Sequence, residues 1–286
     1  MSGARDKVWF VTGCSTGMGR DIALAALARG YRVVLTARNP DTLAEIHARF
    51  PDRSAIARLD VTDRAQIASA VGHAQAVFER IDVLVNNAGY GYLAAIEEGD
   101  EAEVRAMFET NFWGLLAVTR AVVPQMRERR SGQILNNSSQ AGLMSHPGTA
   151  YYSTSKFAVE ALSEGLSREL APFGVKVTAI EAGPVRTDWA GRSMRRTSIR
   201  LADYAEVVGV RAQRIADLDG KQPGDPERAA AAIVALAECP NPPRQLLLGR
   251  GVLAAYRAKL AEVSASLDAW EEVTLGADFP AEGSSA

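Results

Sequence analysis

Tyr152 and Lys156 are the pair of residues in this sequence best suited to transfer a proton. They are four positions apart within residues 151–171, a segment whose pattern predicts a helix, so their side chains share one face. An ammonium group beside a phenol favours the phenolate and lowers the pKa of the hydroxyl. Such a phenol can exchange a proton with an alcohol or carbonyl oxygen. Tyr151 cannot replace it, because Ser155 lies four residues on. An amphipathic helix with a surface lysine is the alternative interpretation.

The segment that precedes Lys156 is polar but carries no charged residue. Residues 131–155 are rich in Asn, Ser, Gly and Thr, and a cation beside such a run suits a closed site. Ser138 and Ser139 follow a predicted strand at 133–137, and ligands bind at the carboxyl ends of strands in open parallel sheets. A hydroxyl at that point can donate to an oxygen on which negative charge develops. Loop capping is the alternative, above all for Ser138.

A glycine-rich turn near the N-terminus is the second feature that could form part of a functional site. Gly13, Gly17 and Gly19 join a predicted strand at 7–12 to a predicted helix at 17–29. Glycines allow a sharp turn and the close approach of a pyrophosphate, which the helix N-terminus attracts. The spacing is G-x-x-x-G-x-G, and no G-K-[ST] follows, so the motif is not a P-loop. It predicts a dinucleotide site, with a ligand-free tight turn as the alternative. The other expected contacts in this turn are Ser15, Thr16 and Met18.

The residue after the second predicted strand selects between the two nicotinamide dinucleotides. NAD sites usually place an acid there to bind the ribose 2′-hydroxyl. Here the strand at 31–36 is followed by Arg38 and by no acid. A guanidinium group can pair with a 2′-phosphate through two charge-assisted hydrogen bonds. Arg38 therefore predicts NADP (NADPH) over NAD, with a solvated arginine at a helix entry as the alternative.

Strands and helices alternate along the chain. Strands are predicted at 7–12, 31–36, 54–59, 81–85, 133–137, 175–180 and 245–248, and helices at 17–29, 41–50, 62–78, 100–130, 151–171 and 225–237. Thr62 is the expected N-cap of the third helix. Short apolar strands between helices predict an α/β fold with a Rossmann-type doubly wound parallel sheet. We expect a single domain over 1–286, with a strandless insertion at about 188–224 and a helical extension at about 251–286.

The composition excludes several classes of protein. The 286 residues include 34 acidic and 32 basic side chains, so nucleic acid is not an expected partner. Two cysteines cannot build a disulfide framework or a cysteine-rich zinc site, and they suit a reducing cytoplasm. Neither a signal peptide nor a membrane-spanning segment is recognisable. We therefore expect a cytoplasmic protein with no metal and no membrane partner.

Several motifs in order resemble the classical short-chain dehydrogenase/reductase family. Residues 12–19 match T-G-x-x-x-G-x-G, residues 86–89 match N-N-A-G, and residues 152–156 match Y-x-x-x-K. Ser139 lies thirteen residues before the tyrosine, as in the family, and Asn111 matches the fourth member of its tetrad. The likeness covers roughly residues 5 to 190. Ala182 departs from the family pattern, because it replaces the proline before Gly183.

The resemblance implies a role for each matching residue. Tyr152 would donate or accept the proton, and Lys156 would lower the tyrosine pKa and hold the nicotinamide ribose. Ser139 would orient the substrate oxygen, and Asn111 would hold a water in a proton relay. Further cofactor contacts are implied at Asp60 and Val61 for adenine, at Asn87, Ala88 and Gly89, and at Pro184, Val185 and Thr187 near the nicotinamide. Family members usually form homodimers or homotetramers with twofold symmetry.

The substrate is predicted by class only. Aromatic and apolar residues expected around the pocket favour a lipophilic ketone or secondary alcohol; they are Tyr90, Tyr92, Met144, His146 and Trp189. A 3-oxoacyl group on a carrier or CoA is an alternative, because a basic cluster could steer it; the cluster is Arg192, Arg195, Arg196 and Arg200. A non-catalytic dinucleotide sensor is the other alternative. Since all four tetrad positions are present, we expect an NADP-dependent oxidoreductase.

Overall fold

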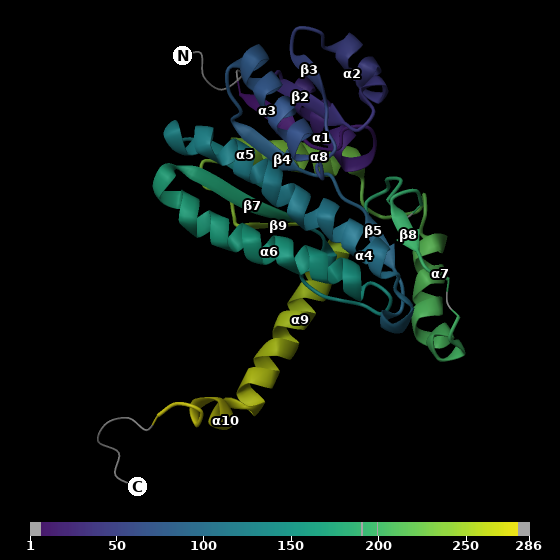
Figure 1. The fold of residues 1–286 in the computed structure, drawn as a ribbon. Coiled ribbons are helices and arrows are strands. Elements are labelled where there is room, and N and C mark those ends of the chain that lie inside the picture. The colour runs from purple at the N-terminus through teal and green to yellow at the C-terminus, as the bar shows by residue number, and fades with distance from the viewer. Residues whose placement is uncertain (1–6, 190, 199, 280–286) are drawn as a thin grey trace.

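Seven parallel strands form the central sheet, and helices cover both of its faces (Figure 1). The computed structural model describes residues 7–189, 191–198 and 200–279. The strand order is β3-β2-β1-β4-β6-β7-β9. The chain runs outward from β1 to β3 and then crosses back to β4, on the other side of β1. This reversal opens a crevice at the carboxyl ends of the strands. The predicted Rossmann-type doubly wound sheet is confirmed.

The strands of this sheet are short and apolar. Their bounds are β1 Val8–Val11, β2 Arg32–Ala37, β3 Ser54–Arg58, β4 Val83–Asn86, β6 Gly132–Asn137, β7 Val175–Ala182 and β9 Gln245–Leu248. Burial on both faces explains why they appear in the sequence as continuous apolar runs rather than as alternating patterns.

Each face of the sheet has its own layer of helices. One layer holds α3 (Arg64–Phe78), α5 (Leu115–Glu128) and α6 (Ala150–Leu170). The other holds α1 (Gly17–Ala28), α2 (Ala44–Arg49) and α8 (Pro226–Glu238). The remaining helices are α4 (Glu101–Phe108), α7 (Val210–Asp217), α9 (Arg250–Ala269) and α10 (Glu271–Leu275).

Two local predictions are wrong. Asp63, not Thr62, caps α3, because its Oδ1 accepts from Ala65 N at 2.9 Å and from Gln66 N at 3.1 Å. Thr62 instead donates to Asp60. The insertion at about 188–224 also contains a strand, β8 (Met194–Arg196), which pairs in parallel with β5 (Gly91–Leu93). Strands of three residues are too short for their side-chain pattern to be recognised.

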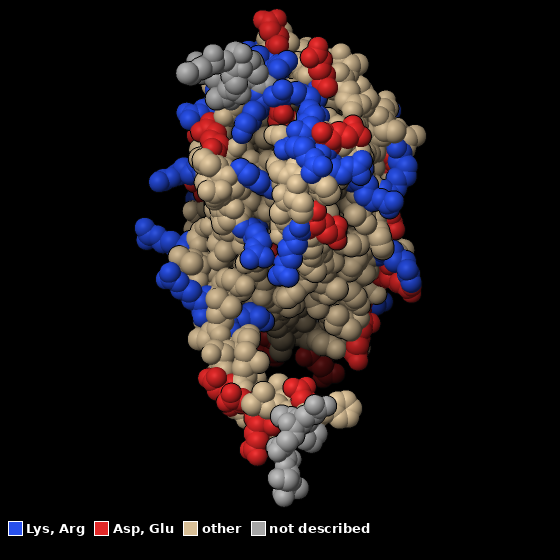
Figure 2. All heavy atoms as spheres, turned by 90° about the vertical axis from the view of Figure 1, so that its left-hand side faces the viewer, with Lys and Arg blue, Asp and Glu red and all other residues tan. Residues whose placement is uncertain are grey.

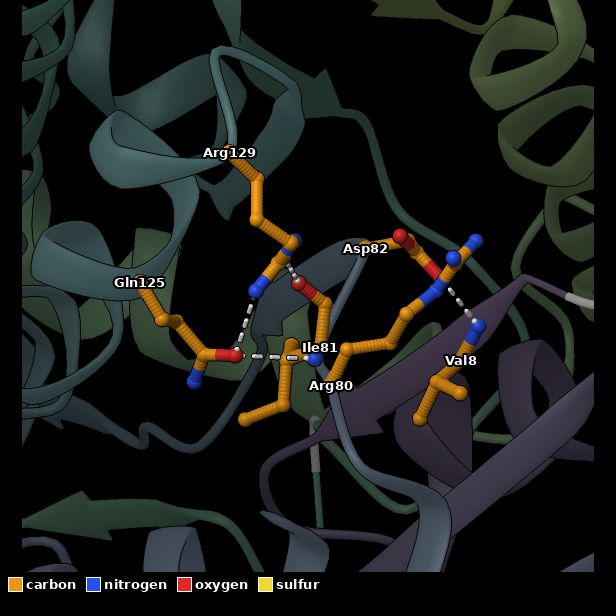
Figure 3. Close-up of polar contacts among 6 residues, drawn as sticks. All are labelled: Val8, Arg80, Ile81, Asp82, Gln125 and Arg129. Atoms are coloured by element: carbon orange, nitrogen blue, oxygen red, sulfur yellow. Dashed lines mark hydrogen bonds and ion pairs between the residues drawn. The ribbon is translucent and has the colours of Figure 1, made fainter.

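A hydrogen-bonded network ties together the amino ends of the central strands (Figure 3). Asp82 Oδ2 accepts from Val8 N at 2.8 Å, which joins the start of β4 to β1. Gln125 Oε1 on α5 accepts from Ile81 N at 3.0 Å and from Arg129 at 2.9 Å. Arg129 also donates to the Ile81 carbonyl at 2.6 Å. The polar groups at the amino ends of the strands thus hold the layers together. The residues predicted to bind cofactor and transfer protons lie at the carboxyl ends.

Helix α9 projects away from the sheet (Figure 1). Its first turn is anchored by Val252, which is 1% exposed and packs with Leu143 and Met144. Farther along, Leu267 and Trp270 are each 63% exposed. Of the predicted extension at about 251–286, residues 280–286 lie outside the described part of the chain. No helix within the described residues is both long enough and apolar enough to cross a membrane.

Charged side chains are unevenly distributed over the face drawn in Figure 2. Lys and Arg are spread over the body of the protein with Asp and Glu among them, whereas the charged side chains at the lower end, where α10 lies, are Asp and Glu. Glu271 and Glu272 form the first turn of α10. The small net charge of −2 therefore combines regions of opposite sign.

Candidate active site

The glycine-rich turn has the geometry of a phosphate cradle. Gly13 and Gly17 adopt φ of +73° and +59°, in the left-handed region that favours glycine. A Cβ on Gly19 would lie 2.3 Å from the Gly13 carbonyl oxygen, so the turn has no room for a side chain there. Thr16 makes no side-chain capping bond to α1, and the first turn of α1 has no acid. The N-terminal amides of α1 are therefore available to an anion, as a dinucleotide pyrophosphate requires.

The N-N-A-G segment is bound directly to this turn. The Thr12 hydroxyl accepts from Asn87 N at 2.8 Å and from Ala88 N at 3.0 Å. Asn87 Nδ2 in turn donates to the Thr12 carbonyl at 2.9 Å. Asn86 points into the interior, where its Nδ2 donates to Thr119 and Asn136, each at 2.9 Å. Asn86 thus ties β4 to β6 and α5, while residues 87–89 border the crevice.

The three predicted adenosine contacts, Arg38, Asp60 and Val61, lie just beyond the ends of β2 and β3. Arg38 follows the last residue of β2, and its side chain is exposed. Asp60 Oδ1 accepts from Thr62 N at 3.0 Å, which shapes the turn after β3. Val61 is buried, and a Cβ on Gly114 would lie 2.7 Å from its side chain. Both ends lie at the carboxyl edge, on the side of the sheet that carries the glycine-rich turn.

Tyr152 lies in a closed aromatic pocket beside Ser139. Its side chain is 4% exposed, and its ring centroid lies 5.5 Å from that of Trp189. Hydrogen bonding with Ser139 and Trp189 acts on the phenol. Ser139 is the N-cap of the short helical turn after β6, and its Oγ accepts from Ala141 N at 3.1 Å. Lys156 Nζ lies 5.9 Å from the Tyr152 ring centroid and donates to the Asn137 carbonyl at 2.7 Å.

The ionisation of this pair differs from the sequence-based prediction. Burial raises the pKa of the Tyr152 phenol to about 12, and the hydrogen bonds with Ser139 and Trp189 oppose this only in part. Burial also lowers the pKa of Lys156 to about 8, against the attraction of Glu160. The net pKa of the phenol is thus raised rather than lowered as expected, because burial is the largest effect on it. A phenol that is protonated at neutral pH is suited to donate a proton.

Asn111 is held in a π-helical segment, Glu109–Gly114, that connects α4 to α5. Its Oδ1 accepts from Tyr90 N at 3.0 Å, and its Nδ2 donates to the Tyr90 carbonyl at 2.9 Å and to Ser155 at 3.2 Å. A Cβ on Gly89 would lie 2.9 Å from Asn111 Oδ1 and 3.7 Å from Lys156 Nζ. The structure thus brings Asn111 and Lys156 together against the backbone of Gly89.

The loop after β7 reaches across to the glycine-rich turn. A Cβ on Gly17 would lie 3.5 Å from the Thr187 side chain. Val185 is buried and forms a bridge with Gly224, whose N–H donates to the Pro184 carbonyl at 3.0 Å. Ala182, at the family's proline position, is the last residue of β7 and pairs with Leu248. The loop is therefore fixed on both sides without that proline.

Arg192, which the sequence placed in a basic cluster, makes a contact with the glycine-rich turn that sequence reasoning missed. Its Nη2 lies 2.5 Å from Thr16 Oγ1 in the glycine-rich turn, 176 positions away in the chain. It also pairs with Asp188 at 3.5 Å, and Arg195 pairs with Glu103. Two members of the predicted basic cluster are therefore compensated by acids, which weakens the case for a surface that steers an acidic carrier.

The predicted substrate residues separate into two groups. Tyr90 and Trp189 pack in the same apolar cluster as Tyr152. Tyr92 belongs to that cluster too, but it is 1% exposed, and its hydroxyl is bound to Thr197 and accepts from Asp100 N, so it lies behind the wall. Met144 packs instead with Val252 at the start of α9, and burial together with Arg211 lowers the pKa of His146.

Comparison with known proteins agrees with this architecture. A family model described as short chain dehydrogenase matches residues 7–197. Oxidoreductase BOA17 of Botryotinia fuckeliana is 39% identical over 271 residues, which cover 94% of this chain and 98% of that protein. A 3-ketodihydrosphingosine reductase of Bacteroides thetaiotaomicron is 33% identical over 245 residues, or 85% of this chain and 88% of that protein.

Solved structures extend the likeness to three dimensions. A short-chain dehydrogenase from Streptomyces avermitilis has a TM-score of 0.90 and 43% identity, covering 96% of this chain and 100% of that one. An alcohol dehydrogenase of the archaeon Thermococcus sibiricus, complexed with 5-hydroxy-NADP, has a TM-score of 0.71 and 25% identity, covering 85% and 95%. The motifs, the sheet order and these matches together establish that the chain belongs to the short-chain dehydrogenase family of oxidoreductases, which bind a nicotinamide dinucleotide.

Proposed function

We propose that this protein is an NADP(H)-dependent oxidoreductase acting on a lipophilic ketone or the corresponding secondary alcohol. The observation that carries the proposal is the buried Tyr152 phenol. This phenol lies beside Ser139 and Lys156. At the same edge of the sheet, the loop after β7 reaches the glycine-rich turn through Thr187. The nicotinamide, when bound, supplies or accepts the hydride. The other steps of the reaction fall to side chains of this chain.

In the reduction direction, Tyr152 donates its proton to the carbonyl oxygen as hydride reaches the carbonyl carbon. The Ser139 hydroxyl donates to the same oxygen and stabilises the negative charge that develops on it. The Lys156 ammonium, close to Gly89 and Asn111, favours transfer of the tyrosine proton and would hold the nicotinamide ribose when the dinucleotide is bound. Asn111 holds the end of a relay that returns a proton to Tyr152.

The substrate class follows from the walls of the pocket. Tyr90 and Trp189 surround Tyr152 with aromatic surface. Such walls favour an apolar substrate with one polar group to be oriented. A relative named 3-ketodihydrosphingosine reductase supports a ketone as the reacting group.

A panel of ketones assayed by the loss of NADPH absorbance tests this proposal. Aromatic and long-chain ketones should be reduced with higher kcat/KM than small polar ones, and NADPH should be preferred to NADH. Binding of dinucleotide without turnover of any ketone or alcohol would instead identify a non-catalytic dinucleotide sensor.

Replacing Arg38 with Ala should remove the preference for NADPH. Loss of a charge-assisted contact to the 2′-phosphate should raise the KM for NADPH about 10- to 100-fold, as expected for roughly 1.5–3 kcal/mol. The KM for NADH should change less than about twofold, because its ribose has no such phosphate. Arg49→Ala, on the exposed side of α2, is the matched control. Equal losses for both dinucleotides would disprove the cofactor assignment.

Replacing Arg192 with Ala should weaken both dinucleotides alike. Arg192 contacts Thr16 in the phosphate cradle, so its charge acts on the pyrophosphate that NADPH and NADH share. We expect the Kd of each, measured by fluorescence titration, to rise about 3- to 10-fold. Arg195→Ala is the control, since Arg195 pairs with Glu103 instead. A change confined to NADPH would assign Arg192 to the 2′-phosphate.

We also propose a cytoplasmic homodimer or homotetramer. Trp113 and Phe157, on the long helical segments that include Asn111 and Tyr152, are 45% and 42% exposed, and such apolar surface favours a twofold contact. Both cysteines are unpaired, in keeping with a reducing compartment. Light scattering after size-exclusion chromatography measures the mass, and Phe157→Glu should reduce it.

A further inference from the structure

A buried glutamate on β7 has no side-chain donor for either of its carboxyl oxygens. Glu181 is completely buried, and no side chain in the described part of the chain donates a hydrogen bond to either oxygen. The backbone N–H groups of Glu181 and Leu246 favour its charge, but burial outweighs them. Its side chain lies on the same face of the sheet as Ala179, whose partner in β9 is Gln245. That face is covered by α6. A fully ionised carboxylate in such a place is strongly disfavoured.

The partner that Glu181 faces is a second glutamate. Glu160 on α6 is within hydrogen-bonding reach of Glu181, and its own Oε2 accepts from Gln245 Nε2 at 3.3 Å. Two ionised carboxylates at that separation repel each other, and such pairs relieve the repulsion by sharing one proton. Burial, with Glu160 close by, raises the pKa of Glu181 to about 9, and burial also raises the pKa of Glu160.

The carboxyl pair touches the loop that carries Ser139. A Cβ on Gly142 would lie 2.5 Å from Ser138 Oγ and 3.0 Å from Glu160 Oε1, so both oxygens lie against the backbone of Gly142. Neither atom has a hydrogen-bond partner among the described residues. The nearby Ser138 hydroxyl favours the ionised form of Glu160 and so opposes the rise in its pKa. Ser138, left to loop capping by the sequence, therefore connects the pair to the loop.

The pair also lies close to the proposed catalytic lysine. Lys156 is one helical turn before Glu160 on α6, and Glu160 favours its ammonium form. The other groups that face the pair are Ser138 and, from β9, Gln245. Glu160 lines an adjoining groove of about 650 Å³, together with the charged residues Glu164, Arg168, Arg244 and Lys259. Glu164 pairs with Arg168. Lys156 is the cation whose charge acts on Glu160.

We propose that Glu160 and Glu181 share a single proton, and that the resulting single negative charge positions Ser138 and stabilises the Lys156 ammonium. Glu160 and Glu181 would act on the reaction only through Ser138 and Lys156, so they are positioning residues. The effect on turnover rests on the proposed function, whereas the shared proton does not.

The shared proton is tested on the purified protein without substrate or dinucleotide. In infrared spectra at pH 7, the wild type should show the carbonyl stretch of a protonated carboxyl group, and Glu181→Gln should lack it. Glutamine mimics the protonated acid, so this variant should keep its fold. Glu164→Gln, on the exposed side of the same helix, is the control and should keep the band. A wild-type spectrum without this band would overturn the proposal, even if the variant failed to fold.

The pH dependence of stability is an independent test. The folded state holds the Glu181 proton up to a pKa of about 9, whereas the unfolded chain releases it near the usual value of 4.5. The unfolded state thus binds fewer protons over this window, and stability falls as the pH rises through it. The unfolding midpoint of the wild type should fall by several degrees between pH 5 and pH 9. That fall should be smaller in Glu181→Gln, and an identical fall would count against the pair.

Turnover tests the link to Lys156. Glu160→Gln removes the carboxylate that acts on Lys156 from one helical turn away, so the alkaline limb of the kcat profile for ketone reduction should move down by about 1 pH unit. Ser138→Ala should raise KM more than it lowers kcat, through loosening of the Ser139 loop. A protonated carboxyl band in a protein that reduces no ketone would reject the proposed function alone. Normal turnover with no such band would reject the pair alone.

Discussion

Tyr152→Phe should lower kcat for ketone reduction by about 10²- to 10⁴-fold, the usual contribution of a positioned general acid. The substitution removes the hydroxyl that would donate the proton and keeps the ring that packs against Trp189. The Kd for NADPH, measured by fluorescence titration, should change little, because the phosphate cradle lies in a separate turn. Single-turnover mixing of enzyme, NADPH and ketone separates the chemical step from binding.

The neighbouring tyrosine provides the matched control. Tyr151 is half-buried on the same helix, and its hydroxyl donates to the Ile96 carbonyl at 2.7 Å. Tyr151→Phe keeps the ring and loses only this bond, so it should retain kcat within about twofold. If Tyr152→Phe kept the turnover of the wild type, the proposed role of this phenol would be rejected.

Lys156→Met should abolish most of the turnover and at the same time stabilise the fold. Burial lowers the pKa of Lys156 to about 8 from its usual 10.5, so the folded state disfavours the ammonium that it holds at pH 7. Removing this charge should add about 1–3 kcal/mol to the free energy of unfolding, on the scale of 1.36 kcal/mol per pKa unit. The lost bond to the Asn137 carbonyl offsets part of that gain.

The pH dependence gives the sign of this effect. Between pH values of about 8 and 10.5 the unfolded chain binds the lysine proton and the folded chain does not, so the contribution of Lys156 to wild-type stability rises with pH there. Lys156→Met should lose this rise, as calorimetric unfolding at several pH values would show. Ketone reduction by the wild type should decline as pH rises through about 8, when the ammonium is lost. Lys176→Met is the control, because Lys176 is exposed.

The sequence predicted the sheet well because its signals are strong and local. Apolar runs such as 8–11 and 83–85 are buried on both faces, and glycines or caps end the helices around them. The exceptions involve weak signals. Asp63 and Thr62 are both good capping residues, and their neighbours decide between them. The β5–β8 pair joins two segments of three residues that lie about a hundred positions apart.

The positions of the site residues were predictable from motifs, but their environment was not. Spacing alone places Tyr152 and Lys156 on one face of a helix. The direction of the tyrosine pKa depends on how completely the pocket closes, which no spacing encodes. In the same way, the contact of Arg192 with Thr16 and the pairing of Glu160 with Glu181 exist only after the chain has folded. Tyr92 looked like a pocket residue and is buried behind it.

The order of strands in the sheet has a consequence for synthesis on the ribosome. The half-sheet β3-β2-β1-β4 uses only residues 8–86, so every one of its pairings is available before Ser139 and Tyr152 have been translated. Nascent chains acquire structure from the N-terminal side as they emerge. One face of this half-sheet nevertheless waits for α8, which packs beside α1 and ends at Glu238. The strands that flank the glycine-rich turn can thus pair early in synthesis, whereas α8, which covers this face of the sheet, is among the last segments to be translated.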